Sequence, residues 1–184
     1  MIIRPLTIMA ERPTPPAPSD EVQIGNQIWK SKNLAIDDGQ GGIYTQTVNY
    51  GQGNVVEYYY TWEAAVRVAA TVNGWHLPTI TEWNTLANTV GGSSVGGTQL
   101  KSTYGWNDDG NGTDDYGFAV FPSGYITKNG YFWEIGSKVY FWTANQSSAT
   151  YATTRWFVNT NIGIYGTNED KLDRYSVRLV KDAT

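Results

Sequence analysis

Two apolar anchors, Phe141-Trp142 and Tyr175-Ser176-Val177-Arg178-Leu179-Val180-Lys181, organise the chain. The second anchor alternates apolar and polar residues, as a half-buried strand does. Between the anchors, residues 143–174 are dominated by Thr, Asn, Ser, Tyr and Gly. Tyrosine gives a large contact area at low entropic cost, and Ser, Gly and Asn give adaptable hydrogen bonding. The pattern therefore predicts either a display surface held by two buried anchors or an ordinary polar loop.

The composition favours one globular domain. The chain has 184 residues, of which 40% are hydrophobic and 16% are charged, so it can bury a substantial core. Aromatic residues reach 14%, including 8 Trp and 13 Tyr, which favours a β-rich core or a binding surface. The net charge is −4 and no basic stripe is visible, so we expect no nucleic-acid partner. No apolar run approaches the ~20 residues that span a bilayer, so we expect no membrane insertion.

The residues that carry most enzyme chemistry are scarce. The chain contains no cysteine, which excludes disulfides, thiolate metal sites and cysteine nucleophiles. His76 is the only histidine, which excludes a multi-histidine metal site, and we expect it to play a structural part in a corner between two helices. No nucleophile elbow or phosphate loop is present. We therefore expect a non-enzymatic protein without a cofactor.

The N-terminal segment differs from the rest of the chain. Residues 11–20 contain four prolines, which is typical of a semi-rigid extended spacer. We expect residues 1–20 to form an extended Pro-rich segment or linker, and residues 21–184 to form one domain with a C-terminal display region at 143–175. Arg4 and Pro5 interrupt the first ten residues, which lack the apolar core of a secretory signal.

Helical periodicity appears twice in the first half of the domain. From Thr61 to Val72 the apolar residues follow helical spacing, with Thr61 as N-cap, and Asn73-Gly74 ends the helix. Thr79 and Glu82 form the Thr-x-x-Glu pattern of a capping box, which predicts that a second helix begins there.

Most of the remaining chain is predicted to consist of short strands and turns. Residues 37–54 have the composition of a loop with at most one short strand. Strands are predicted at 22–34, 98–102, 118–122, 131–135, 139–142, 155–158 and 175–181. Together these patterns predict an α+β fold in which two helices pack on a mostly antiparallel, loop-rich β section.

A series of short motifs in this order resembles one known family. The motifs are Ile24–Trp29 with Asn33-Leu34, Tyr60–Ala65, Gly74–Thr79 with Glu82-Trp83, Leu100-Lys101-Ser102, Gly117-Phe118-Ala119, Phe141-Trp142-Thr143 and Ser176–Asp182. The series resembles the Fibrobacter succinogenes major paralogous domain. That resemblance implies a C-type-lectin-like fold, related to the domain of formylglycine-generating enzymes, whose activity needs cysteines that this chain lacks.

The resemblance also implies a function. Similar domains serve bacteria and phages as variable proteins of diversity-generating retroelements, and their diversified region lies between a Phe-Trp anchor and a Ser-Val-Arg strand. We therefore expect a protein or glycan ligand on a cell surface, and a virion-associated or extracellular location. The expected binding residues are Asn145, Tyr151, Thr153, Thr154, Trp156, Asn159, Thr160, Asn161, Tyr165, Asn168, Asp170 and Asp173. Trp156 either belongs to this surface or faces the core from its strand. We expect one contiguous exposed face that contains Tyr151, Thr153, Thr154, Asn159, Asn161, Tyr165, Asn168 and Asp170. There are two alternatives. One is a fixed-sequence bacterial surface adhesion or carbohydrate-binding module, with or without dependence on calcium. The other is an inactive relative of formylglycine-generating enzymes.

One loop carries candidate ligands for a structural calcium ion. Asn107, Asp109, Asn111 and Asp114-Asp115 offer oxygen ligands on a glycine-rich segment. The twelfth position counted from Asn107 is Phe118, where an EF-hand needs Glu. Trp106-Asn107-Asp108 resembles part of a calcium-lectin signature, but the partnering triplet is missing. A solvated turn capped by its own side chains is the favoured interpretation.

Overall fold

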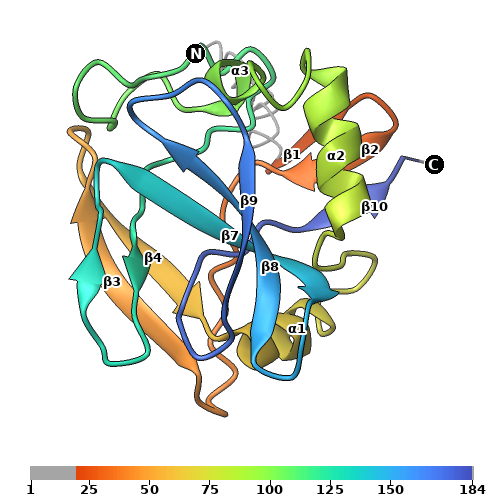
Figure 1. Ribbon diagram of the computed structural model, residues 1–184, viewed down its shortest axis with the longest axis vertical. Helices are drawn as coiled ribbons and strands as arrows, with labels where there is room; N and C mark the ends of the chain where they lie inside the picture. Colours follow the sequence, from red (N-terminus) through yellow and green to blue (C-terminus); the bar gives the residue numbers. More distant parts are fainter. Residues whose placement is uncertain (1–19, 184) are drawn as a thin grey trace, which may run out of the picture.

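The computed structural model describes residues 20–183, so the predicted Pro-rich segment lies outside the described residues except for Asp20 (Figure 1). The elements are β1 (Glu21–Ile24), β2 (Gln27–Lys30), β3 (Ile43–Asn49), β4 (Asn54–Tyr60), α1 (Trp62–Ala69), α2 (Ile80–Thr89), α3 (Gly97–Leu100), β5 (Tyr125–Ile126), β6 (Phe132–Trp133), β7 (Lys138–Gln146), β8 (Tyr151–Val158), β9 (Tyr165–Asp170) and β10 (Val180–Asp182). The predicted α+β class is confirmed.

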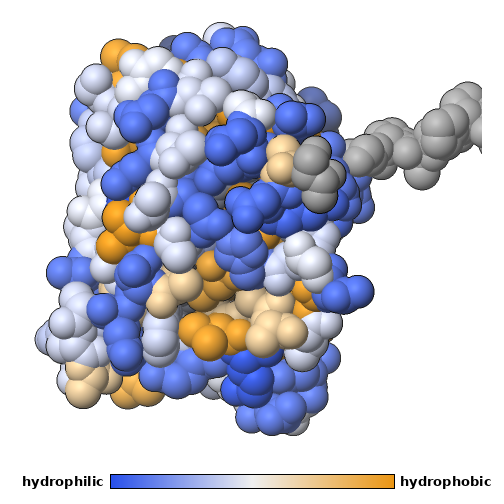
Figure 2. Space-filling model, turned by 90° about the vertical axis from the view of Figure 1, so that its right-hand side faces the viewer, coloured by the Kyte–Doolittle hydropathy of each residue, from blue (hydrophilic) through white to orange (hydrophobic). Residues whose placement is uncertain are grey.

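The strands form small antiparallel sheets. Their orders are β1-β2-β10, β3-β4, β5-β6 and β7-β8-β9. In Figure 1 the β7-β8-β9 sheet crosses the middle of the molecule, with the β3-β4 hairpin at the left and the β1-β2-β10 sheet and α2 at the right. The face that carries α2 and β10 is mostly hydrophilic, with a smaller apolar area in its lower half (Figure 2).

Both predicted helix starts are confirmed. Thr61 is the N-cap of α1 and accepts a hydrogen bond from the backbone N–H of Ala64. Thr79 and Glu82 form a complete capping box at the start of α2. The first helix ends at Ala69, three residues before the predicted end at Val72.

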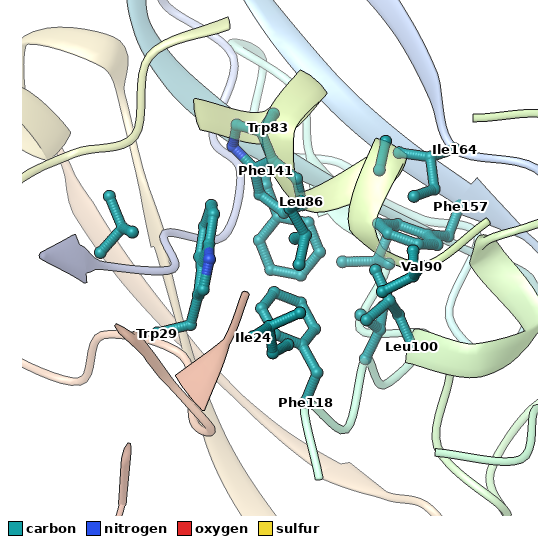
Figure 3. Close-up of a cluster of buried hydrophobic side chains, with 14 of the residues drawn as sticks. Ile24, Trp29, Trp83, Leu86, Val90, Leu100, Phe118, Phe141, Phe157 and Ile164 are labelled. Carbon is teal, nitrogen blue, oxygen red and sulfur yellow. The ribbon is translucent and has the colours of Figure 1, made fainter. Parts of the chain in front are cut away.

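The hydrophobic core consists of two clusters. The first surrounds Trp83, whose ring centroid lies 5.0 Å from that of Trp29 and 5.6 Å from that of Phe141 (Figure 3). The second packs α1 against Trp142 and Tyr175, whose ring centroids are 4.7 Å apart. Adjacent residues of a strand point to opposite faces, so Phe141 and Trp142 enter different clusters.

The two predicted anchors are buried, which confirms the expectation for them. Phe141 and Trp142 have no exposed surface, and Ser176, Val177 and Arg178 are at most 1% exposed. Most of the second anchor is not a regular strand, however. Its first residues join the fold through single bridges, such as that between Phe141 and Ser176, and only Val180–Asp182 belong to β10.

Arg178 is a buried cation held by neutral acceptors. It donates to the side-chain oxygen of Asn33 from Nε (3.1 Å) and Nη2 (2.9 Å), and from Nη1 to the backbone carbonyls of Lys30 (3.1 Å) and Phe118. Its guanidinium also lies 4.6 Å from the centroid of the Phe118 ring. Burial lowers the pKa of Arg178 to about 10, while the carboxylates of Glu57 and Asp114 act in the opposite direction.

Several predicted elements were wrong. Within residues 37–54 the one expected short strand is present as β3, and the structure adds β4, for which no strand was predicted, because Asn54–Tyr60 is rich in β-branched and aromatic residues. Residues 98–102 form α3 and a single bridge rather than a strand. A Cβ on Gly97 would lie 2.5 Å from the carbonyl oxygen of Gly163, so a close backbone approach fixes this segment.

Candidate functional site

The predicted display region is a three-stranded sheet and not a polar loop. β8 is the central strand, and it pairs with Lys138–Gln146 of β7 on one side and with β9 on the other. Side chains alternate between the two faces of a strand, so the two faces of this sheet have different compositions. One face carries a row of half-buried aromatic rings, and the other is apolar where it enters the core and polar at its exposed end.

The aromatic face is built around Trp156. Its ring stacks on Tyr165 at 4.3 Å and lies 6.2 Å from Tyr140, both measured between centroids. Tyr140 in turn lies 5.4 Å from Tyr125 of the β5-β6 hairpin. The Nζ atom of Lys138 lies 4.9 Å from the centroid of Trp156 and 5.2 Å from that of Tyr140, within reach of a cation–π interaction.

Trp133 extends this face toward solvent. It lies opposite Tyr125 in the register of the β5-β6 hairpin, so the two side chains share a face. Trp133 is 55% exposed, whereas Tyr125, Tyr140, Trp156 and Tyr165 are half-buried. We call these five aromatic residues the aromatic strip.

The electrostatics of the aromatic strip centre on Lys138. The Glu134 carboxylate lies 3.5 Å from its ammonium. Burial acts to lower the pKa of Lys138, but contacts with Tyr140 and Glu134 outweigh it and raise that pKa, which keeps the cation charged. Burial raises the pKa of the Tyr125 and Tyr140 phenols, so both remain neutral donors. Trp156 Nε1 is buried without a hydrogen-bond partner among residues 20–183.

The opposite face of the sheet enters the core through Val139, Phe141 and Phe157, and its exposed end, which we call the polar face, carries other predicted site residues. Thr153 donates to the side-chain oxygen of Asn168 at 2.9 Å, and Arg155 donates to that of Asn84 in α2 at 2.9 Å. Tyr151, which is 48% exposed, belongs to the same row of β8. Thr153 and Arg155 of the polar face therefore already bond to other side chains.

The expectation of one contiguous exposed face was therefore wrong. Strand alternation separates Thr153 and Asn168 from Trp156 and Tyr165 by the thickness of the sheet. Thr154 has no exposed surface, because it faces inward beside Ala152 and donates to the Thr167 carbonyl.

Asn159 is also buried, at 9% exposed, which overturns its predicted exposure. Its side-chain amide donates to the Asp108 carboxylate at 2.9 Å, so it connects the end of β8 to the 107–111 loop. Thr160 and Asn161 are exposed beyond it. The Asn161 side-chain oxygen accepts from the backbone N–H of Ile162 at 2.7 Å and so stabilises its own turn.

The other predicted site residues shape the fold locally. The Asn145 side-chain oxygen accepts from the backbone N–H of Ile80 at 2.7 Å, at the start of α2. Asp170 accepts from the ammonium of Lys128 at 2.7 Å, and this partner lowers the pKa of Asp170. Asp173 accepts from the backbone N–H of Lys128, also at 2.7 Å. Each of these side chains holds two segments of the surface together.

The sequence analysis missed the lysine that attaches the sheet to α1. Lys171 is only 6% exposed, and its ammonium lies 4.3 Å from the centroid of Trp62. It donates to the Gln146 side-chain oxygen at 2.6 Å and lies 4.0 Å from the Glu63 carboxylate. A lysine in a polar segment gives no sequence signal for such burial.

Two of the four candidate calcium ligands already accept hydrogen bonds from the backbone. Asn111 accepts from the backbone N–H of Trp106 at 3.0 Å, and Asp114 accepts from that of Ala119 at 2.7 Å. Asn107 donates its amide to the Ser137 hydroxyl at 3.3 Å, and Asp109 adopts a φ of 57° in an exposed turn. Within residues 20–183, no three His, Cys, Asp or Glu side chains group as ligands of a metal would.

His76 lies in the corner between α1 and α2, as expected. Its Nε2 pairs with the Glu82 carboxylate, and its backbone bridges Val180 of β10. Burial acts to raise the pKa of Glu82, but hydrogen bonds from Thr79 and His76 outweigh it and lower that pKa. Both carboxylate oxygens of Glu82 therefore already accept hydrogen bonds, one from His76 and the other from Thr79 of the capping box.

The geometry defines a class of protein: a small α+β domain whose C-terminal sheet carries an aromatic and a polar surface. The family is shown by comparison of the sequence, since residues 22–181 match the family described as the Fibrobacter succinogenes major domain. The chain belongs to this family. No curated protein and no solved structure matches the chain. No helix among residues 20–183 has the length and apolar character needed to cross a membrane.

Proposed function

We propose that this protein is a non-enzymatic binding domain with a C-type-lectin-like fold. It binds a protein or glycan on a cell surface through the aromatic strip, and it needs no cofactor. The observation that carries the proposal is the row of five rings that runs from the exposed Trp133 to Tyr165. Half-exposed aromatic residues dominate the energetics of binding surfaces.

The aromatic strip suits binding better than the polar face does. Trp156 is held between Tyr165, Tyr140 and Lys138, so little side-chain entropy remains to be lost when a ligand contacts it. On the polar face, Thr153 and Arg155 already have side-chain partners.

We extend the proposal to a biological role as the variable protein of a diversity-generating retroelement, located on a virion or an extracellular surface. Membership of the family and the Thr-, Asn- and Tyr-rich segment between the anchors support this role. The gene should then lie near a reverse transcriptase and a near-identical template repeat of the segment that encodes residues 145–174. A gene neighbourhood with neither element would contradict the role as a variable protein but not the binding site.

The binding site is tested by screening glycan and protein arrays with the wild-type protein and two variants. Trp156→Ala should weaken any saturable binding about thirtyfold, because truncating a central aromatic residue typically costs ~2 kcal/mol. Tyr151→Ala is the matched control, an aromatic residue of the same strand on the polar face. Circular dichroism and melting temperature would show that both variants are folded.

Two results would count against the aromatic strip. If Tyr151→Ala abolishes binding while Trp156→Ala leaves it intact, the polar face is the site. If a folded wild-type protein shows no saturable binding to any glycan or protein of the host surface, the binding function is refuted.

A fixed-sequence carbohydrate-binding module is the second candidate. The row of rings favours it, since sugar rings can stack on exposed aromatic side chains. Saturable binding to one glycan class, unaffected by a chelator and combined with a gene neighbourhood that lacks a template repeat, would support this candidate over the variable protein.

A further inference from the structure

A second concave site lies away from the β7-β8-β9 sheet. It is a pocket of about 270 Å³ between the 31–35 segment, the end of the β3-β4 hairpin and the 119–121 segment. A water molecule occupies about 30 Å³ in the liquid, so the space corresponds to roughly nine waters or a small organic molecule. Ligand pockets for drug-sized molecules are somewhat larger.

Aromatic and aliphatic side chains form most of its wall. The rings of Tyr50 and Phe121 lie 4.8 Å apart, and those of Tyr104 and Phe121 lie 5.0 Å apart. Val55 and Val56 also line the pocket, and they are 46% and 53% exposed. Such exposure of valine on a hairpin leaves apolar surface available to a ligand.

One acidic group, the carboxylate of Glu57, lines this apolar pocket. Glu57 is only 7% exposed. Its Oε1 accepts from the Tyr50 hydroxyl at 3.0 Å, and its Oε2 accepts from the Asn33 amide at 3.0 Å. A carboxylate can accept about four hydrogen bonds, so each oxygen retains one free acceptor position.

The basic side chains near the pocket do not form ion pairs with Glu57. Arg178 also lines the pocket, but it donates to Asn33 and to backbone carbonyls rather than to Glu57. Lys32 at the pocket is 75% exposed and pairs with Asp20 at 2.8 Å. Among residues 20–183, no Lys, Arg or His nitrogen lies within ion-pair distance of Glu57.

We propose that this pocket binds a small organic ammonium ion that carries an aromatic or branched aliphatic body. The ammonium group donates to the free positions of Glu57, and the body packs against Tyr50, Tyr104 and Phe121. Arg178 reaches Glu57 only through the side chain of Asn33, so a positive charge in direct contact still complements this buried carboxylate, and aromatic rings favour cations over neutral groups. This site is separate from the aromatic strip, and its test does not depend on the proposed function.

The proposal is tested by calorimetric titration of the wild-type protein with three probes of similar shape. Phenethylamine carries the ammonium group, 2-phenylethanol replaces it by a neutral donor, and 3-phenylpropionate replaces it by an anion. Phenethylamine should bind and raise the melting temperature, 2-phenylethanol should bind at least tenfold more weakly, and 3-phenylpropionate should show no binding.

Variants then locate the site. Glu57→Gln should weaken phenethylamine binding at least tenfold, whereas Glu63→Gln, which removes an exposed carboxylate of α1, should leave it unchanged. If Glu57→Gln does not fold, Ala35→Phe provides the test, because Ala35 is exposed at the pocket and a larger side chain there fills the space.

Three outcomes would overturn the proposal. The first is no binding of phenethylamine at millimolar concentration. The second is equal affinity for phenethylamine and 2-phenylethanol, which would exclude recognition of the charge. The third is phenethylamine binding that survives Ala35→Phe at wild-type affinity, which would place the ligand elsewhere.

Discussion

Arg178→Lys tests whether the buried guanidinium fork holds the fold together. Arg178 is 1% exposed and donates through three nitrogens to Asn33 and to the carbonyls of Lys30, Phe118 and Ala119. Lysine keeps the charge but concentrates its donors on one atom, which cannot reach this spread of acceptors. Hydrogen bonds to charged groups contribute about 1.5–3 kcal/mol each. Loss of two of them predicts a decrease of about 3–6 kcal/mol in the free energy of unfolding.

Urea unfolding followed by tryptophan fluorescence measures this change, and thermal unfolding provides a second readout. A domain of this size loses about 2–4 °C per kcal/mol, so the melting temperature should fall by roughly 10 °C. The matched control is Arg67→Lys. Arg67 also forms a fork, with the Asp38 carboxylate at 2.7 Å and 3.1 Å, but its side chain is 33% exposed.

Arg67→Lys should change the free energy of unfolding by no more than about 1 kcal/mol, because partly exposed ion pairs contribute little. If Arg178→Lys is as mild as Arg67→Lys, the hydrogen-bond network around the second anchor does not stabilise the fold as we infer. Any remaining loss in the free energy of unfolding of Arg178→Lys would then reflect the lost contact between the guanidinium and the Phe118 ring.

Three further perturbations test other parts of the structure. Thr79→Ala should destabilise the protein by about 1 kcal/mol in urea unfolding, and Thr79→Ser should restore most of that loss, because the hydroxyl caps α2. Burial raises the pKa of Tyr50, Tyr59 and Tyr175 above the usual value near 10. The contribution of these buried neutral phenols to the free energy of unfolding is fully present below about pH 10. Above that pH the phenols of the unfolded chain ionise, so the free energy of unfolding falls by about 1.4 kcal/mol per phenol and pH unit. Thermal melts should therefore show a steep fall in melting temperature from about pH 10 upward, and a flat profile would contradict it. Millimolar calcium should leave the melting temperature unchanged, because Asp114 already caps a backbone N–H; a rise of several degrees would restore the calcium interpretation.

The sequence predicted those features that depend on local chemistry. The capping box at Thr79 and Glu82 needs only residues three apart, and the burial of Phe141-Trp142 follows from an apolar pair beside a polar segment. These signals are complete within a few residues, so distant contacts could not change them.

The sheet in the display region could not be predicted in the same way. β9 has the sequence Tyr-Gly-Thr-Asn-Glu-Asp, which contains few residues that favour strands. It forms because β8 offers an unpaired edge, and that pairing is a tertiary effect. The aromatic strip depends on the registers that place Tyr140, Trp156 and Tyr165 side by side. The sequence does not give these registers, so it could not show that Trp156 and Thr153 lie on opposite faces of the sheet.

The position of Phe141 and Trp142 in two different core clusters has a consequence for how the domain can evolve. A slip of β7 by one residue would send each ring into the cluster built for the other, where its size and shape do not fit. This pair therefore fixes the pairing of β7 from inside the protein. Substitutions at solvent-facing positions of β8 and β9 should then leave the register of the sheet unchanged, because the residues that fix it lie in the core.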